Sequence, residues 1–296
     1  MTDSTRLAPV RRLALALAAG CALGGAAQPA SAAQAATTIK IDDTTRAQIT
    51  RIDGTHVRVR ILPDGATQTL EVKAVDEDGH FGIESADYNF DGHRDLSFAA
   101  TLGQVNREYQ IFLYDDAQRR FEPLRMASEK GPNGNCDGLW NISPAPKTHV
   151  LNSSCRGGPM WYTDAWRYRA DGRLYLYQAD APLPDEVNAL FGLPEDSGPD
   201  SILITYDETG HVVAREAQVY GGGKATMKVK VARLPLHERA QDTPTKRYVV
   251  AGDILDVLDV SDDGSWLKVR DTRPSGNPQA HAVAGWVAVS EAAATP

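Results

Sequence analysis

The residue types with the clearest chemical meaning lie in one short stretch, residues 87–95. Oxygen-bearing side chains recur there at every second position, with a glycine after the third: Asp87, Asn89, Asp91, Gly92 and Asp95. Alternate residues of a tight loop point inward, and glycine allows a bend where a Cβ would clash. His93 would add its backbone carbonyl, and Asp95 would close the site directly or through water. Oxygen ligands without sulfur or imidazole suit Ca²⁺, so this stretch predicts a calcium loop.

The calcium loop has two alternatives. In an EF-hand the bidentate glutamate would fall where this chain has Phe98, and the flanking segments have strand patterns, so the loop is not an EF-hand. The second alternative is an Asx-rich turn without an ion, because Asp and Asn side chains also bond their own backbone. Four side-chain ligands in register favour the ion.

Residues 1–32 have the pattern of a secretory signal peptide. Three arginines precede an apolar run over residues 13–27, and Ala30 to Ala32 form a small-residue cleavage site. The run is too short, and too rich in Ala and Gly, for a convincing membrane span. In the alternative, Cys21 is the lipidated residue of a lipoprotein, but Ala stands in place of the usual Leu three positions before it. We expect a cleaved, periplasmic protein.

The expected mature chain is acidic and carries two cysteines. The signal peptide contains three Arg and one Asp, so its removal takes the net charge from −8 to −10. This charge argues against nucleic acid and anionic lipid as partners and suits a basic partner. An even cysteine count in an exported protein predicts a disulfide, here between Cys136 and Cys155. Two free thiols are the alternative, and a zinc site is poorly supported because His149 is the only histidine nearby.

Strand periodicity dominates the rest of the chain. Alternating apolar and polar residues separated by turn residues recur at 56–62, 68–73, 109–114, 165–169, 174–177, 201–206 and 211–214. Only residues 185–191 suggest a helix. The sequence therefore predicts an all-β chain in which one face of each strand feeds the core. A polar segment with a proline, residues 239–246, is typical of a linker.

The last fifty residues resemble the bacterial SH3 domain. The matching elements follow the family order: Gly252 and Asp253, the segment Leu255 to Val257 with its alternating apolar residues, an acidic turn before Trp266, and Gly285 to Val287. This resemblance implies a small SH3-like barrel over residues 245–292, a module found on exported proteins that meet the cell wall. Trp266 and Trp286 would be either ligand-binding aromatics or core residues.

Residues from about 55 to 180 are similar to a family of Gram-negative periplasmic proteins that inhibit lysozyme-like peptidoglycan hydrolases. The matching segments are 87–92, 109–121, 153–162, 166–168 and 171–172. Members act as immunity partners of secreted cell-wall-degrading effectors. The resemblance implies a calcium-binding β-sandwich or propeller-like domain, which we expect over residues 33–238. The implied partner is a lysozyme-like hydrolase, and peptidoglycan is a further expected partner through the SH3-like domain.

Inhibitors of this kind often present a loop that enters the hydrolase cleft. The segment with Arg156, Gly157, Gly158 and Tyr162 is similar in composition to that loop and differs in spacing. Glycines allow close backbone approach, Arg156 could pair with a catalytic carboxylate, and Tyr162 could fill a sugar subsite. The alternative is an ordinary turn with Trp161 and Tyr162 in the core.

The sequence does not favour an enzyme. Zincin and Gly-x-Ser-x-Gly motifs are missing from it. The strongest enzymatic alternative is a cell-wall cysteine peptidase with Cys136 as nucleophile, but the prolines after Trp140 prevent the helix that such a cysteine needs. A glycosidase stays open because many carboxylate pairs are available. The remaining alternative is a calcium-binding cell-wall protein that inhibits nothing.

Overall fold

The computed structural model describes residues 36–127, 134–183, 187, 201–219, 225–271 and 283–293. Nearly all regular structure in these ranges is antiparallel strand, which confirms the all-β prediction. The expected signal peptide at 1–32, with Cys21, lies outside the described residues. The helix expected at 185–191 also lies outside them, apart from Val187. Within the described residues, no helix has the length and apolar character needed to cross a membrane.

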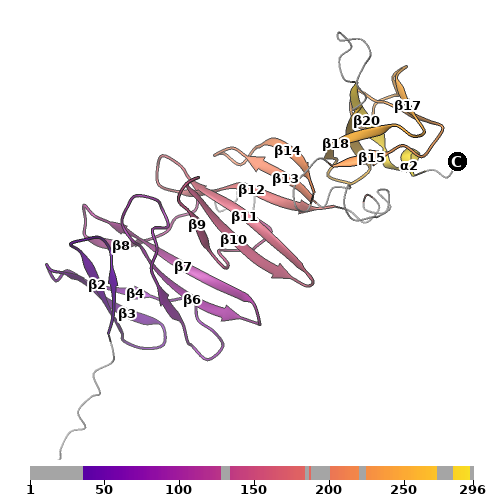
Figure 1. Cartoon of the computed structure of the whole chain (residues 1–296). Coiled ribbons are helices and arrows are strands. Elements are labelled where there is room, and N and C mark those ends of the chain that lie inside the picture. The colour runs from indigo at the N-terminus through magenta and orange to yellow at the C-terminus, as the bar shows by residue number, and fades with distance from the viewer. Residues whose placement is uncertain are drawn as a thin grey trace, which may run out of the picture. The chain divides into compact units, whose positions relative to one another are not determined.

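The first two sheets are four-stranded antiparallel meanders, drawn in indigo to magenta (Figure 1). The strands of the first sheet are β1 (Thr37–Lys40), β2 (Arg46–Arg51), β3 (His56–Leu62) and β4 (Thr67–Glu71). The strands of the second are β5 (Gly82–Glu84), β6 (Leu96–Leu102), β7 (Asn106–Asp115) and β8 (Arg120–Pro123). In each sheet the strands are neighbours in chain order, and the longest connection within a sheet is residues 85–95 between β5 and β6.

The third sheet has six strands in the order β14-β13-β12-β11-β10-β9. They are β9 (Ser143–Ala145), β10 (Val150–Gly157), β11 (Met160–Tyr168), β12 (Leu174–Pro182), β13 (Ser201–Tyr206) and β14 (Val212–Gln218). The longest strands, β10 to β12, form its centre and carry the hairpin predicted to bind a partner (Figure 1).

Alternation along the strands creates the cores between these sheets. In β3, Val57, Val59 and Ile61 are at most 1% exposed, while the arginines between them are exposed. They pack with Phe98 and Phe121 in a cluster shared by the first and second sheets. A second cluster joins the second and third sheets through residues that include Tyr88, Ile111, Leu151, Trp166 and Leu174.

Amide side chains fasten the sheets to one another. Gln68 of β4 donates from Nε2 to the carbonyl of Phe121 at 2.9 Å and accepts from its N–H at 2.8 Å. Gln110 accepts from the N–H of Lys73 at 2.7 Å and donates to the carbonyl of Glu71 at 3.1 Å. Each glutamine therefore satisfies backbone groups that two separate sheets would otherwise leave unpaired.

The C-terminal region holds two smaller sheets. The fourth is ordered β15-β18-β19-β20 and the fifth is β16-β17. Their strands are β15 (Thr226–Lys228), β16 (Arg233–Pro235), β17 (Tyr248–Val250), β18 (Ile254–Val260), β19 (Trp266–Asp271) and β20 (Ala284–Ala288), followed by the one-turn helix α2 (Val289–Ala292). Among the described residues none of the five sheets closes on itself.

The C-terminal core extends upstream of the segment that resembles an SH3 domain. Strand β15 pairs with β18, and β16 pairs with β17. The apolar cluster of this region takes Met227 and Leu234 from before residues 239–246 and Leu267 and Val287 from after them. The expected linker therefore lies within one packed group of strands that begins at β15.

The third sheet contacts this C-terminal group through the shared apolar cluster, which includes Ile202 of β13, and through the polar contacts of one arginine. Arg215 of β14 donates to Asp259 at 3.0 Å, to Asp262 at 2.7 Å and to the carbonyl of Val260 at 2.8 Å. These charge-assisted bonds occupy both edges of the guanidinium, which favours a fixed contact between β14 and β18.

Candidate functional sites: an acidic loop and an anchored hairpin

The predicted calcium loop joins β5 to β6 and is held by its own side chains. The carboxylate of Asp87 accepts from the N–H groups of Asp91 at 3.2 Å and Gly92 at 3.0 Å. Asn89 donates to Asp91 at 2.8 Å, and Asp91 accepts from the N–H of His93 at 2.8 Å. Gly92 has a φ of +94°, in the left-handed region where a Cβ is unfavourable. The structure thus brings the predicted side chains together around one tight bend.

Asp95 plays a different part from the other acidic residues of the loop. Its side chain is fully buried, and its two oxygens accept at 2.8 Å from the N–H groups of Tyr88 and Tyr114. Burial raises the pKa of Asp95 to about 7, against the lowering effect of these two hydrogen bonds. Asp95 therefore ties the loop to β7. It could ligate an ion only through its remaining lone pairs or through water.

The ring of His93 contacts the first sheet. Its Nδ1 lies 3.5 Å from a carboxylate oxygen of Asp42, and its ring centroid lies 5.8 Å from that of Tyr114. Hydrogen bonds from the backbone N–H groups and hydroxyls of Thr44 and Thr45 hold the pKa of Asp42 well below its usual range. The ring of His93 therefore faces Asp42 and Tyr114, and the contribution of its backbone carbonyl to an ion site stays a prediction.

The donor chemistry of the loop fits Ca²⁺, but its oxygens bond the loop's own amides. In the part of the chain that the structure describes, no three His, Cys, Asp or Glu side chains converge into a metal-binding group. The amide of Asn89 and the backbone carbonyl of His93 are not among these four side-chain types. The other predicted ligands are carboxylates, the ligand type that Ca²⁺ prefers. Calcium binding stays a prediction, and it requires Asp87 and Asp91 to turn their oxygens toward the ion.

The loop also contacts the third sheet through two aromatic residues. The ring of Phe90 stacks on that of His149 with centroids 5.4 Å apart and an interplanar angle of 10°. Both residues have positive φ values, 64° and 51°, which bulky side chains rarely adopt. The tip of the loop is therefore held against the β9–β10 turn, so an ion-induced change at Asp91 would be felt there.

The second predicted site is the β10–β11 hairpin. Arg156 lies opposite Trp161 and Cys155 lies opposite Tyr162, with Gly158 and Pro159 forming a two-residue turn. Gly158 has a φ of +59°, which suits tight hairpin turns. Arg156, Gly157 and Gly158 are all exposed. The predicted partner-binding residues are thus on one short projecting element.

Three separate contacts fix the base of this hairpin. Cys136 and Cys155 form a disulfide with Cα atoms 5.6 Å apart, which confirms the predicted pair. Asn106 of β7 accepts from the N–H of Arg156 at 2.8 Å and donates to its carbonyl at 2.9 Å. Asn141 donates to the carbonyl of Ser154 at 2.9 Å. These bonds satisfy the edge of β10 beyond its short pairing with β9, so the strand is held up to its tip.

Asp164 of β11 is a fourth anchor, and the sequence analysis missed it. Its fully buried carboxylate accepts from the N–H groups of Asn135 and Cys136, both at 2.9 Å. Burial raises the pKa of Asp164, against the lowering effect of these bonds. A Cβ on Gly134 would lie 2.0 Å from this carboxylate, so only glycine fits there. The one available signal was an acidic residue in an otherwise uncharged run before Trp166, which is weak.

The side chains at the hairpin tip divide into packed and exposed ones. Trp161 is 54% exposed, although the sequence analysis considered it only as a core residue. Tyr162 is half-buried, and its ring lies 3.1 Å from the position that a Cβ on Gly157 would take. The guanidinium of Arg156 donates to the carbonyl of Gly158 at 3.1 Å. The tip therefore presents one cation and one indole outward, while Tyr162 covers the glycine backbone.

The remaining sequence candidates are placed as follows. Cys136 is disulfide-bonded and so is unable to act as a nucleophile, which removes the residue on which the peptidase alternative depends. Trp266 and Trp286 lie on neighbouring strands β19 and β20, and both are half-buried. The ring of Trp266 packs edge-on against the buried His237 at 4.8 Å. These tryptophans therefore contribute to packing and still expose part of their surface.

Comparisons of this chain with protein-family models, with curated proteins and with solved structures found no match.

Proposed function

We propose that this protein is a periplasmic inhibitor of a lysozyme-like peptidoglycan hydrolase, of the immunity type. It would act by inserting the β10–β11 hairpin into the hydrolase cleft. The observation that carries the proposal is a rigid base under an outward-facing tip: a disulfide, Asn106 and Asp164 hold the strands, while Arg156 and Trp161 point to solvent. An element ordered before binding loses little conformational entropy when it binds.

Each residue of the tip has a role in this proposal. Arg156 would form a bidentate ion pair with a catalytic carboxylate, because glycoside hydrolases place two carboxylates at the scissile bond. Trp161 would fill a sugar subsite, since buried Trp and Arg anchors dominate most interfaces. Tyr162 would hold Gly157 and Gly158 at the depth where their backbone meets the cleft wall. The protein would block its target and hydrolyse nothing.

The finer features of the fold are also proposals. The two four-stranded meanders support a propeller-like or sandwich-like arrangement of the N-terminal sheets, with the loop at 87–95 binding Ca²⁺. Strands β17 to β20 support the SH3-like assignment of residues 245–292, which would bring the protein to peptidoglycan. A signal peptide at residues 1–32 would deliver it to the periplasm, and lipidation at Cys21 is the alternative.

A second candidate function is a calcium-binding cell-wall protein that inhibits no enzyme. The partial exposure of Trp266 and Trp286 favours it, because aromatic faces stack on sugars and neither side chain is fully buried. In that case peptidoglycan binding would depend on these tryptophans and would be unchanged by substitutions at Arg156 or Trp161.

The deciding experiment is a cell-wall turbidity assay with a panel of muramidases and the mature protein in excess calcium. We expect at least one muramidase to be slowed at micromolar inhibitor. The double substitution of Arg156→Ala and Tyr162→Ala should weaken inhibition by about thirtyfold or more, the effect of losing a central anchor. Val213→Ala is the matched control, because Val213 is 61% exposed on a different hairpin. If no muramidase is slowed, the wall-binding alternative takes its place.

A further inference from the structure

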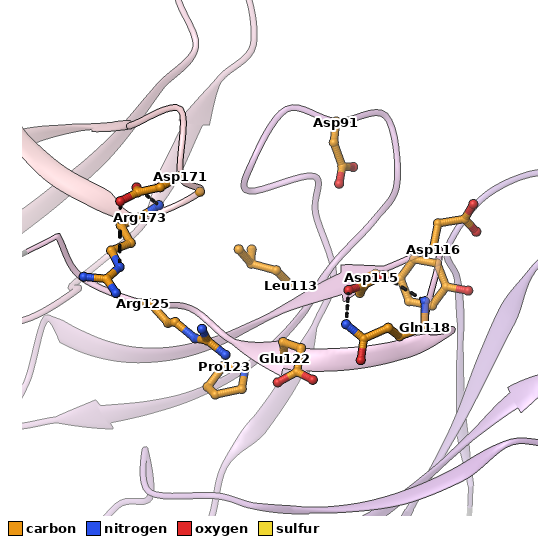
Figure 2. A pocket seen from close by; sticks show the side chains of 12 residues that line it. Asp91, Leu113, Asp115, Asp116, Gln118, Glu122, Pro123, Arg125, Asp171 and Arg173 are labelled. Atoms are coloured by element: carbon orange, nitrogen blue, oxygen red, sulfur yellow. Dashed lines mark hydrogen bonds and ion pairs between the residues drawn. The ribbon is translucent and has the colours of Figure 1, made fainter.

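A cleft of about 630 Å³ lies beside the acidic loop and has no part in the proposed function. Its walls are the β7–β8 turn, strand β8 and the β11–β12 turn, and Asp91 projects toward it from the loop (Figure 2). The volume is in the range of ordinary ligand pockets. The lining is mostly polar, with Leu113 and Pro123 as apolar members, so charge and hydrogen bonds would contribute most to the recognition of a ligand there.

Positive charge lies on one side of this cleft only, although carboxylates line it elsewhere as well, among them Asp171 beside Arg173 and Glu122 between the two sides. Figure 2 shows Arg125 and Arg173 on one side, with Asp115 and Asp116 on the other. Asp115 ends β7 and Asp116 begins the β7–β8 turn, whereas Arg125 follows the end of β8, so the length of β8 separates the two sides. Four residues of strand span roughly 13 Å. A ligand that meets both sides must therefore carry separated charges at about that distance.

The two charged groups nearest to such a ligand are unengaged. Within the described residues, neither the carboxylate of Asp116 nor the guanidinium of Arg125 has a hydrogen bond or ion pair, and both residues are exposed. Arg173 is held only loosely, with its Nε 3.9 Å from Asp171. In contrast, Asp115 accepts two bonds from Gln118, at 2.9 and 2.7 Å. The cleft thus offers a carboxylate and a guanidinium without internal partners.

We propose that this cleft binds a short peptide with free termini, about four residues long. The ammonium group lies at Asp116 and the terminal carboxylate lies at Arg125 and Arg173. An extended chain covers at most about 3.3–3.6 Å per residue, so four residues match the roughly 13 Å between the two sides. The proposal requires neither calcium in the loop nor a hydrolase at the hairpin.

The test uses tetra-alanine, whose only charges are its two termini. Isothermal titration calorimetry in excess calcium compares the free peptide with its N-acetylated form, which lacks the ammonium, and its C-amidated form, which lacks the carboxylate. We expect the free peptide to bind about three- to tenfold more tightly than either capped form, as for one exposed charge pair. Equal affinity of all three peptides, or no binding at about 10 mM free peptide, would overturn the proposal.

Two substitutions assign each terminus to its side. Asp116→Asn should abolish the preference for free over acetylated peptide and keep the preference for free over amidated peptide. Arg125→Gln should do the reverse. Asp78→Asn and Arg58→Gln, at exposed positions away from the cleft, are the matched controls and should change neither preference.

A cation site is the competing occupant of the acidic side. Omitting calcium and adding chelator leaves the peptide affinity within about twofold if the proposal holds. If added Ca²⁺ instead displaces the free peptide and the Asp116→Asn variant abolishes that competition, the acidic side is a cation site and the peptide proposal fails. Because both substituted residues are exposed, thermal melts should show unchanged folding in every variant.

Discussion

Two fully buried carboxylates do the same structural work in different regions of this protein. Asp95 in the acidic loop and Asp164 in the hairpin each accept hydrogen bonds from two backbone N–H groups at 2.8–2.9 Å. Burial raises the pKa of both. They differ in their surroundings, because Asp95 has Asp87 and Asp91 nearby, while Asp164 lies beside a disulfide.

This difference separates a region whose accessible groups are acidic from one whose accessible groups are an arginine and a tryptophan. At the loop, the buried carboxylate fixes a bend on which further acidic groups stay accessible, so the same backbone bonds could prepare an ion site. At the hairpin, the buried carboxylate fixes residues 134–136 and the disulfide, and the accessible groups are Arg156 and Trp161. A buried acid therefore identifies an anchor, and the exposed residues around it indicate what that anchor serves.

The largest effect should come from removing the anchor of the hairpin. Asp164→Ala leaves two buried amide groups without acceptors, at about 1–3 kcal/mol each, so we expect the free energy of unfolding to fall by about 4 kcal/mol. Asp164→Asn is the matched control, because its amide keeps one acceptor oxygen and should lower stability less. Urea denaturation measures both. A loss under about 1 kcal/mol for Asp164→Ala would show that the network is not an anchor.

The disulfide should contribute slightly less than Asp164. Replacing Cys136 and Cys155 by serine opens a loop with a sequence separation of 19 residues, which the chain-entropy model values at about 3 kcal/mol. The same urea series measures this loss, and mass spectrometry of unreduced peptides from periplasmic protein verifies the bond. A free thiol at Cys136 in that material would contradict the structure and restore the peptidase alternative.

Local features of both regions are visible in the sequence. The loop residues Asp87 to Asp95 are close in sequence and alternate, so their pattern predicts a tight bend. Gly157 and Gly158 predict a loop at the hairpin tip, although the strands β10 and β11 that form the hairpin were not predicted there. The disulfide follows from the cysteine count once Cys21 is assigned to the expected signal peptide. These features depend on residues a few positions apart, or on residues of a rare type, and for that reason they can be found without a structure.

The anchors are invisible to the same analysis because their partners are distant along the chain. Asp164 bonds residues 28 and 29 positions upstream, and Asn106 bonds a residue 50 positions away. Gln68 and Phe121 are separated by 53 positions. Nothing in the spacing of an isolated Asp, Asn or Gln indicates which backbone group it will meet. The same reason explains why the upstream strands β15 and β16 were not expected to pack with the C-terminal segment.

The pH dependence of the calcium-free protein should report on Asp95. Because its folded pKa, about 7, lies above the ordinary value of 3.8, the folded state binds more protons in this window and stability falls as pH rises. As pH rises from 5 to 7, the contribution of Asp95 to the free energy of unfolding falls by about 2 kcal/mol. Chemical denaturation in the presence of a chelator gives the free energy of unfolding at each pH. The contribution of Asp95 is the difference between the pH profiles of wild type and Asp95→Asn. Parallel pH profiles for the two proteins would refute the assignment.

Calcium should stabilise the protein by a similar amount. With a dissociation constant of about 10⁻⁴–10⁻³ M, as for extracellular modules, about 10 mM Ca²⁺ adds about 2 kcal/mol to the free energy of unfolding. Asp91→Ala should abolish this gain, whereas Asp78→Asn, outside the loop, should keep it. Calorimetry on chelator-stripped protein should show one site. Identical titrations for Asp91→Ala and wild type would mean that the loop is an Asx-rich turn without an ion.

The smallest effect on stability is expected at the hairpin tip, where the effect on function should be largest. Trp161 is 54% exposed, so Trp161→Ala should change the free energy of unfolding by less than about 0.5 kcal/mol. The inhibition constant of the Trp161→Ala variant, measured against a muramidase that the wild-type protein slows, tests the central claim most directly. We predict a loss of about thirtyfold or more for Trp161→Ala and none for the Val213→Ala control. Equal inhibition by wild type, Trp161→Ala and Arg156→Ala would contradict the hairpin as the inhibitory element.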